Sequence, residues 1–339
     1  MVAAPAAAVS AVRLPTYADI ETAAQRLKGQ AVETPLIESR DLNARTGGRL
    51  FIKPENLQRT GSFKFRGARN KICALLGSAQ PPKNVVAFSS GNHAQGVAAA
   101  AQIAGIGATI VMPSDAPDIK IANTRSYGAE VVFYDRYRDD REAITAGIAR
   151  EKQAAIVRPF DDPDIIAGQG TIGREVFTQL AGICAAADVL LSPCGGGGLV
   201  SGIALAMAEL SPKTKVHAVE PALFDDTARS LVAHSRQKNA PDARSICDAL
   251  LSPMPGELTF QLNDRLLAGA LGVTDDEVLA AMDYAFRMLK LVAEPGGAVA
   301  LAAVLTGKID LKGKTAVIVI SGGNVDPQMF ARAIGGKAS

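Results

Sequence analysis

The sequence predicts an α/β protein whose parallel sheets are covered by helices on both faces, and three observations support this class. Short, continuous apolar runs recur along the chain from residue 85 onward. Stretches of about 10–15 residues with a helical pattern separate these runs, as in parallel sheets. The composition, with 48% hydrophobic and 21% charged residues, is that of an ordinary globular protein, and 339 residues suffice for about two domains.

Each apolar run is expected to be a strand that is buried on both faces of its sheet. The expected strands comprise residues 85–88, 108–113, 130–135, 154–160, 188–194, 215–221 and 315–321. The helical patterns that follow five of them comprise residues 93–105, 119–128, 141–153, 164–180 and 195–210.

Proline-containing breaks indicate how the chain divides into domains. A Pro-Pro pair precedes the first apolar run, and Pro159 lies at the end of the fourth. We expect a small domain over residues 81–159 and a large, cofactor-binding domain formed by residues 1–80 and 160–339. Because ligands of such sheets bind at the carboxyl ends of strands, the active site is expected in the cleft between the two domains.

Composition and charge argue against several classes of function. The net charge of +2 and the lack of a basic run disfavour a nucleic-acid-binding face. The four cysteines form no C-x-x-C pair, so they are expected to be reduced thiols in the cytoplasm. The sequence contains no apolar stretch of about 18 residues, so no membrane-spanning helix is predicted. The expected partners are a small molecule and a second copy of the chain.

Four consecutive glycines at residues 195–198 follow the fifth expected strand and precede a helix. Successive backbone N–H groups can converge closely on an anion where side chains are absent, and the helix dipole adds to the attraction. The loop lacks the Gly-Lys-Ser/Thr of a Walker A motif, and Val200 stands where a GxGxxG motif has its third glycine. It therefore predicts a phosphate site without a nucleotide fingerprint.

Lys64 lies between Phe63 and Phe65 in the stretch TGSFKFRGA, where a turn leads into an expected helix. Such a lysine is most often a solvated residue at a helix start, since lysine is rarely buried. It can instead be an amine that apolar neighbours keep deprotonated and hence nucleophilic. The stretch by itself leaves both interpretations open.

Polar residues also follow three further expected strands. The segment SSGNH at 89–93 offers helix N-terminal N–H groups to a carboxylate, or is a plain helix cap. Ser321 can bond a ring nitrogen or a carboxylate, or can simply end its strand. Glu220 and Asp226 can bind a hard cation together with a backbone carbonyl, or can form an ordinary acidic turn.

Together these motifs resemble the fold-type II, pyridoxal-phosphate-dependent enzymes, and within them the serine/threonine dehydratase (threonine ammonia-lyase) and serine racemase group. The resembling segments are SFKFRGA, SSGNHAQG, AGQGTI, GGGGLVSG, EPALFDD, PGELTF, EPGGA and SGGNVD, in family order over most of the chain. The resemblance implies a two-domain, tryptophan synthase β-like fold with twisted, parallel-rich sheets flanked by helices. It also implies a homodimer.

The resemblance implies a role for each matching position. Lys64 would hold pyridoxal 5'-phosphate covalently and remove the Cα proton, and in a racemase Ser90 would be the acid/base on the opposite face. The residues that would further contact the cofactor are Phe63, Asn92, Gly195, Gly196, Gly197, Gly198, Leu199, Glu294 and Ser321. Those that would bind the substrate are Ser89, Ser90, Gly91, Asn92 and His93. Those that would hold a divalent cation, Mg²⁺, Mn²⁺ or Ca²⁺, are Glu220, Phe224 through its carbonyl, and Asp226.

The activity that the resemblance implies is removal of water and ammonia from a β-hydroxy-α-amino acid of the L-threonine/L-serine type. Two departures leave the substrate open: Arg158 replaces a frequent histidine, and Cys247-Asp248-Ala249 replaces Ala-Asp-Gly. The alternatives are 3-hydroxyaspartate, phenylserine or a hydroxyectoine-derived substrate. Serine racemisation is a second hypothesis, because exchange on both faces of Cα needs two opposed acid/base groups. A cofactor-free binding module is a third, which the presence of Lys64 disfavours.

Overall fold

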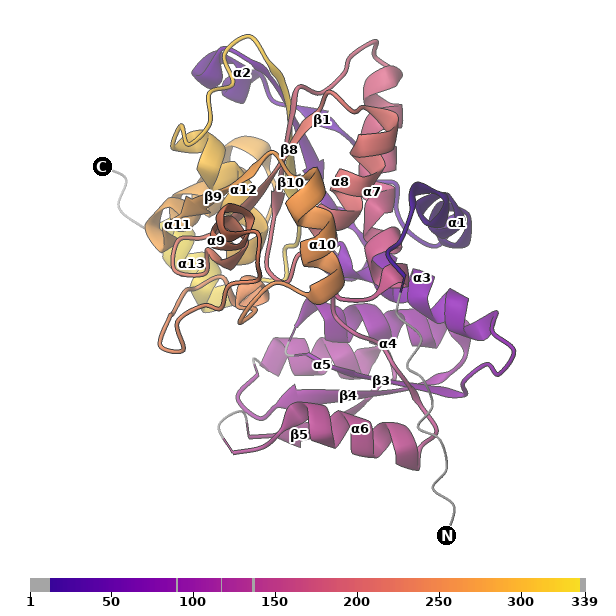
Figure 1. Cartoon of the computed structure of the whole chain (residues 1–339). Helices are drawn as coiled ribbons and strands as arrows, with labels where there is room; N and C mark the ends of the chain where they lie inside the picture. The colour runs from indigo at the N-terminus through magenta and orange to yellow at the C-terminus, as the bar shows by residue number, and fades with distance from the viewer. Residues whose placement is uncertain (1–12, 90, 117, 136–137, 336–339) are drawn as a thin grey trace.

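The computed structural model describes residues 13–89, 91–116, 118–135 and 138–335, and it contains two β-sheets (Figure 1). The larger sheet has the order β1-β2-β10-β7-β8-β9, and its β1–β2 pair is antiparallel whereas its other pairs are parallel. Its strands are β1 (Ile37–Glu38), β2 (Arg49–Pro54), β7 (Val189–Pro193), β8 (Lys215–Pro221), β9 (Gly269–Val273) and β10 (Thr315–Ile320).

The smaller sheet has the order β5-β4-β3-β6 and is parallel throughout. Its strands are β3 (Asn84–Phe88), β4 (Gly107–Pro113), β5 (Glu130–Tyr134) and β6 (Ala155–Ile156). In Figure 1 this sheet lies below the larger one, with α4, α5 and α6 beside it.

Helices connect most of the strands. In the first half of the described chain they are α1 (Tyr17–Leu27), α2 (Arg40–Thr46), α3 (Lys64–Leu76), α4 (Asn92–Ala104), α5 (Asp118–Ser126), α6 (Arg141–Glu151) and α7 (Pro163–Ala181). In the second half they are α8 (Gly198–Leu210), α9 (Asp226–Ala233), α10 (Glu257–Leu266), α11 (Asp275–Tyr284), α12 (Pro295–Leu305) and α13 (Pro327–Gly335). Short helical turns are η1 (Glu55–Leu57), η2 (Arg59–Gly61), η3 (Asp248–Leu250) and η4 (Ala285–Leu289).

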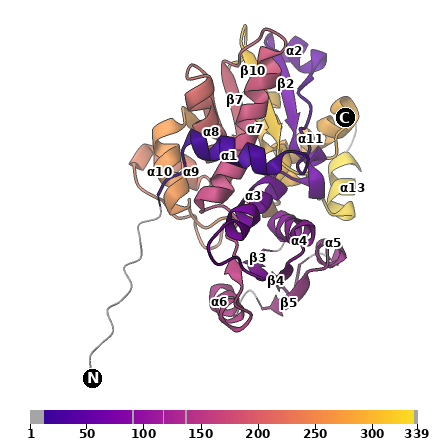
Figure 2. The same cartoon turned by 90° about the vertical axis from the view of Figure 1, so that its right-hand side faces the viewer.

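The larger sheet is buried on both faces, as its continuous apolar strands predict. Alternate residues of β10 point to opposite sides: Ile318 packs in a cluster with residues of α11 and α12, whereas Val317 and Val319 pack in a cluster with residues of α7 and α8. Figure 2 shows α7 and α8 lying together against this sheet. The predicted α/β class with helices on both faces is therefore confirmed.

The expected strands recur in the structure with small changes at their ends, except for the fourth. The run at 154–160 forms only the two-residue β6, because the chain turns away toward Pro159 after Val157 bonds to Val86 of β3. The sequence analysis did not predict β1, β2 or β9. All strands of the smaller sheet lie within residues 81–159, although α3, outside this range, also packs on α4. Among the described residues, no helix has both the length and the apolar character that a membrane span requires.

Candidate active site

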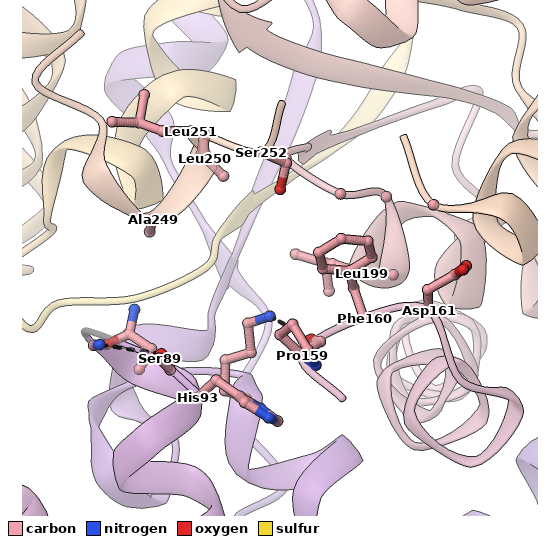
Figure 3. A pocket seen from close by; sticks show the side chains of 18 of the residues that line it. Ser89, His93, Pro159, Phe160, Asp161, Leu199, Ala249, Leu250, Leu251 and Ser252 are labelled. Carbon is pink, nitrogen blue, oxygen red and sulfur yellow. Dashed lines mark hydrogen bonds between the residues drawn. The ribbon is translucent and has the colours of Figure 1, made fainter. Parts of the chain in front are cut away.

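A cavity of about 400 Å³ is lined by residues from both sheets (Figure 3). Figure 3 shows Ser89 and His93 on one side of it and Ala249, Leu250 and Ser252 on the opposite side. The predicted residues that line it are Phe63, Lys64, Ser89, Gly91, Asn92, His93, Gly195, Gly196, Gly197, Gly198, Leu199, Glu294 and Ser321. Ser90 lies outside the described residues, and Glu220, Phe224 and Asp226 do not line the cavity.

Lys64 is the first residue of α3, and backbone contacts fix this helix start against the end of β10. The N–H of Phe63 donates to the carbonyl of Ser321 at 3.1 Å. Ser62 pairs with Gly322 in an isolated antiparallel bridge. These contacts bring the lysine and the serine, which are far apart in the sequence, into one cavity.

Among the residues that the structure describes, the amine of Lys64 contacts a carbonyl and an aromatic ring but no carboxylate. Its Nζ donates to the carbonyl of Pro159 at 2.7 Å and lies 5.2 Å from the centroid of the Phe63 ring. Burial lowers the pKa of Lys64 to about 8, and the charge of Glu294 opposes part of this shift. Phe65 instead lies in the hydrophobic core with no exposed surface. The contact of Nζ with the Pro159 carbonyl and the lowered pKa favour the interpretation of Lys64 as an amine that can lose its proton over that of a solvated residue at a helix start.

The glycine loop has the shape that an anion requires. A Cβ added to Gly196 would lie 2.5 Å from the ring of Phe160, and Gly197 has a φ of +95°, which other residues rarely adopt. The carbonyl of Gly196 accepts a hydrogen bond from Thr259 Oγ1 at 2.7 Å, which fixes the loop. Helix α8 begins at Gly198 without a side-chain cap, so its first N–H groups can bind a phosphate. The residues present thus fit the phosphate of the expected cofactor.

Asn92, at the start of α4, is held by two side chains. Its amide NH₂ donates to Oε1 of Glu294, and its Oδ1 accepts from Asn324 Nδ2 at 2.8 Å. Burial, with the nearby charge of Asp248, raises the pKa of Glu294 to about 7. Sequence analysis placed Asn324 only within the SGGNVD motif and assigned it no role. The structure makes it part of the support for Asn92.

The imidazole of His93 is neutral, and one of its two ring nitrogens is a hydrogen-bond acceptor. Its Nε2 donates to the carbonyl of Val157 at 2.9 Å, because a carbonyl can only accept. Its Nδ1 has no hydrogen-bond partner among the described residues. Burial, and then the charge of Lys64, lower the pKa of His93 to about 3. In the same turn, Ser89 Oγ accepts from the N–H of Gly91 at 3.1 Å.

Glu220 and Asp226 lie together outside the cavity, at the start of α9. The carboxylate of Glu220 accepts from the N–H groups of Thr227 at 3.0 Å and Ala228 at 2.9 Å. Burial raises the pKa of Glu220 to about 8, with a contribution from Asp226, and burial raises the pKa of Asp226 to about 6. Oδ2 of Asp226 has no hydrogen-bond partner in the described part of the chain. No group of three or more His, Cys, Asp or Glu side chains able to hold a metal occurs in that part either.

Comparison with known proteins identifies close relatives of the whole chain. A family model described as "Pyridoxal-phosphate dependent enzyme" matches residues 27–322. The L-threo-3-hydroxyaspartate ammonia-lyase of Saccharomyces cerevisiae is 42% identical, over 96% of this chain and 98% of that protein. The serine racemase of Schizosaccharomyces pombe is 39% identical, over 94% of this chain and 97% of that protein. Among solved structures, the threonine deaminase of T.th. matches with a TM-score of 0.86 at 43% identity, over 92% of this chain and 99% of that chain.

Proposed function

This chain belongs to the pyridoxal-phosphate-dependent enzyme family, and we propose that it removes water and ammonia from a β-hydroxy-α-amino acid to give a 2-oxo acid. The observation that carries the proposal is the meeting of Lys64, the glycine loop and Ser321 in one cavity. An amine, a phosphate site and a hydroxyl for a ring nitrogen are the groups that pyridoxal phosphate needs.

The family and fold class predicted from the motifs are confirmed, and so is the prediction of a pyridoxal-phosphate-dependent lyase. We propose a substrate of the L-threonine/L-serine type. The name of the yeast relative supports 3-hydroxyaspartate, one of the alternatives that the sequence left open.

The residues that would hold the cofactor lie at helix starts and after strand ends. The loop at 195–198 and the start of α8 would bind its phosphate, Lys64 its aldehyde carbon, Asn92 its ring hydroxyl and Ser321 its ring nitrogen. Phe63, Leu199 and Glu294 line the same cavity and would complete its surroundings. When bound, the cofactor withdraws electrons from the Cα of the substrate and so makes the loss of a Cα proton feasible.

The chain's own groups then handle the proton and the carboxylate. Lys64 removes the Cα proton, because an amine with a pKa of about 8 is partly neutral near neutral pH and still basic. The start of α4, with Ser89, Gly91 and His93 around it, holds the substrate carboxylate on its open N–H groups. Pro159 and Phe160 line the cavity beside the lysine and exclude water from it.

Four further parts of the proposal come from the sequence, the homodimer and the cation from the family resemblance and the other two from the positions of prolines and cysteines. They are the division into a small domain at 81–159 and a large remainder, a homodimer, a cytoplasmic location and a divalent cation. The separate four-stranded sheet supports the domain division. The two adjacent carboxyl groups of Glu220 and Asp226 support the cation, since Mg²⁺, Mn²⁺ or Ca²⁺ would neutralise their repulsion. Such a cation would need further oxygens, from the carbonyl of Phe224 and from water.

Serine racemisation is a second candidate, which the 39% identity to a serine racemase favours. It requires Ser90 as a second acid/base, and this residue lies outside the described part of the chain. Recovery of both D- and L-serine carrying solvent deuterium at Cα would show racemisation. Deuterium in the 2-oxo acid alone would show elimination only.

A panel of L- and D-β-hydroxy amino acids tests the proposal directly. The cofactor-loaded enzyme is incubated with serine, threonine, 3-hydroxyaspartate and phenylserine, and the 2-oxo acid and ammonia are measured. We expect equimolar release of both products from at least one L-isomer. A cofactor-loaded enzyme that releases ammonia from none of them would overturn the proposed function.

A further inference from the structure

Lys120 is a second lysine in the cavity, and the motifs did not single it out. It lies on α5, beside the four-stranded sheet, and only 5% of its surface is exposed. Its Nζ forms an ion pair with Asp248 of η3. Both residues line the cavity, so this ion pair lies in its wall and joins α5 to η3.

The ammonium of Lys120 points at the turn that precedes α4. A Cβ added to Gly91 would lie 3.4 Å from its Nζ, which is van der Waals contact. Gly91 is the N-cap residue of α4, and no side chain within the described part of the chain caps this helix. The buried ammonium and the open end of the helix therefore converge on the same point of the cavity.

Lys120 has hydrogen-bonding capacity left over. A lysine ammonium carries three donors. Among the described residues, the one hydrogen-bond acceptor of its Nζ is Oδ2 of Asp248. A buried ammonium with unused donors is costly unless a ligand completes its shell.

Asp248 both balances the charge of the Lys120 ammonium and holds it in position. Its side chain remains 46% exposed although that of Lys120 is only 6% exposed, and it lines the cavity. The turn η3 packs closely on the glycine loop, where a Cβ on Gly195 would lie 3.0 Å from Leu250. Asp248 thus ties Lys120 to the side of the cavity that would carry the cofactor.

We propose that Lys120 binds the α-carboxylate of the amino-acid substrate beside Gly91, and that Asp248 is a positioning residue for its ammonium. This inference rests on the proposed function, because it assumes an amino acid in this cavity. A charge-assisted hydrogen bond from a buried ammonium adds more to carboxylate binding than helix N–H groups alone. It also selects a carboxylate over a neutral amide of the same shape.

The test compares ligands that differ only in the carboxylate. L-Alanine and L-alaninamide lack a β-leaving group, so their dissociation constants can be measured on the cofactor-loaded enzyme through the absorbance of the bound cofactor. In Lys120→Met we expect L-alanine to bind roughly tenfold to a hundredfold more weakly, as for loss of a hydrogen bond to a charged group. L-Alaninamide should change less than about threefold, since it offers no charge to the lysine.

The matched control is Lys152→Met, which breaks another lysine–carboxylate pair beside the same sheet. Lys152 pairs with Glu130 and does not line the cavity. This variant should bind both ligands as the parent enzyme does. A loss of L-alanine binding in the control equal to that in Lys120→Met would overturn the inference.

Two other outcomes also contradict the inference. An equal loss for both ligands would mean that Lys120 maintains the shape of the cavity, and no loss for either would mean that it does not touch the ligand. If Lys120→Met does not fold or bind cofactor, Asp248→Asn takes its place. We then expect a smaller weakening that is again confined to L-alanine.

The binding test with L-alanine and L-alaninamide does not depend on the proposed lyase activity. It needs only cofactor and ligand binding, so it remains informative if no β-hydroxy amino acid releases ammonia. Conversely, ammonia release with unchanged binding in Lys120→Met would leave the proposed function standing and remove the role of Lys120.

Discussion

Lys64 and Lys120 lie in the same cavity and have opposite electrostatic environments. Burial lowers the pKa of Lys64 to about 8, because the charged amine is removed from water, and the charge of Glu294 opposes only part of this shift. Burial also acts on Lys120, but contact with Asp248, and the nearby charge of Glu294, raise its pKa above the usual value. Contact with one carboxylate, that of Asp248, thus distinguishes Lys120, which stays charged, from Lys64, which can lose its proton.

This difference assigns different tasks to the two sides of the cavity. On the side of α3 and the glycine loop, an amine that can become neutral is suited to covalent bonding and proton transfer. On the side of α5, a permanent cation that Asp248 holds is suited to binding a carboxylate. Substitutions on either side of the cavity should therefore impair different steps.

Replacing the reactive amine should abolish activity while leaving the fold intact. Lys64→Ala should lower the release of ammonia by at least about 10³-fold, because a nucleophile and a base are lost together. The visible absorbance of covalently held cofactor should disappear from the purified protein. Lys120→Met is the comparison, since it should keep this absorbance. Retention of the band in Lys64→Ala would refute the assignment of the covalent lysine.

A side chain added to the glycine loop should weaken cofactor binding without affecting the side of the cavity around Lys120. In Gly196→Ala the new Cβ meets the ring of Phe160 at 2.5 Å, so we expect a loss of about 1–3 kcal/mol in stability and weaker cofactor binding. Gly147→Ala is the control: it lies inside α6 with no atom within 4 Å of an added Cβ. This control should stabilise the protein by about 0.5–1 kcal/mol. Urea unfolding and cofactor titration measure both effects.

The two sides of the cavity also differ in how far the sequence predicted them. Lys64, the glycines at 195–198 and Ser321 lie in contiguous segments at strand ends or helix starts, and short-range patterns reveal such segments. Lys120 and Asp248 are single charged residues in an ordinary helix and turn. Only the packing of α5 against η3 brings them together, so no local pattern could indicate their pairing.

Strand β2 was not predicted for the same reason, because a contact with a residue far along the chain decides whether one of its residues is buried. Its run of apolar residues is interrupted by Lys53, a residue that normally lies on the surface. In the structure Lys53 is fully buried because its Nζ reaches Glu175 of α7 at 2.7 Å and the carbonyl of Thr34 at 2.7 Å. The partner of the charge lies far along the chain, so the strand could be recognised only in the folded protein.

Glu220 and Asp226 offer a contrasting case, in which two buried groups of like charge are neighbours. The pKa of Glu220 is about 8 and that of Asp226 about 6, both above their usual values, so each favours the folded state only while it is protonated. The stability that they contribute is therefore present at low pH and is lost as pH rises through about 6 and then about 8.

We therefore expect the metal-free protein to lose thermal stability between pH 5 and pH 8.5, and Glu220→Gln to lessen this loss by about 1 kcal/mol. Millimolar Mg²⁺, Mn²⁺ or Ca²⁺ should restore the melting temperature of the parent protein at pH 8 but not that of the variant. Melting curves across pH, with and without cation, measure the effect. A parent protein whose melting temperature at pH 8 ignores all three candidate cations would remove the proposed cation site.

The smallest expected effect concerns Glu294, the carboxyl group that raises the pKa of Lys64. Glu294 raises the pKa of Lys64, and it can do so only when it is ionised, above its own pKa of about 7. Glu294→Gln keeps an oxygen that can accept from Asn92 but removes the charge, so the pKa of Lys64 should fall below about 8. The acidic limb of the pH profile of kcat should move to lower pH, because the neutral amine becomes available earlier. A limb that moves to higher pH, or not at all, would show that a group other than Lys64 governs the profile.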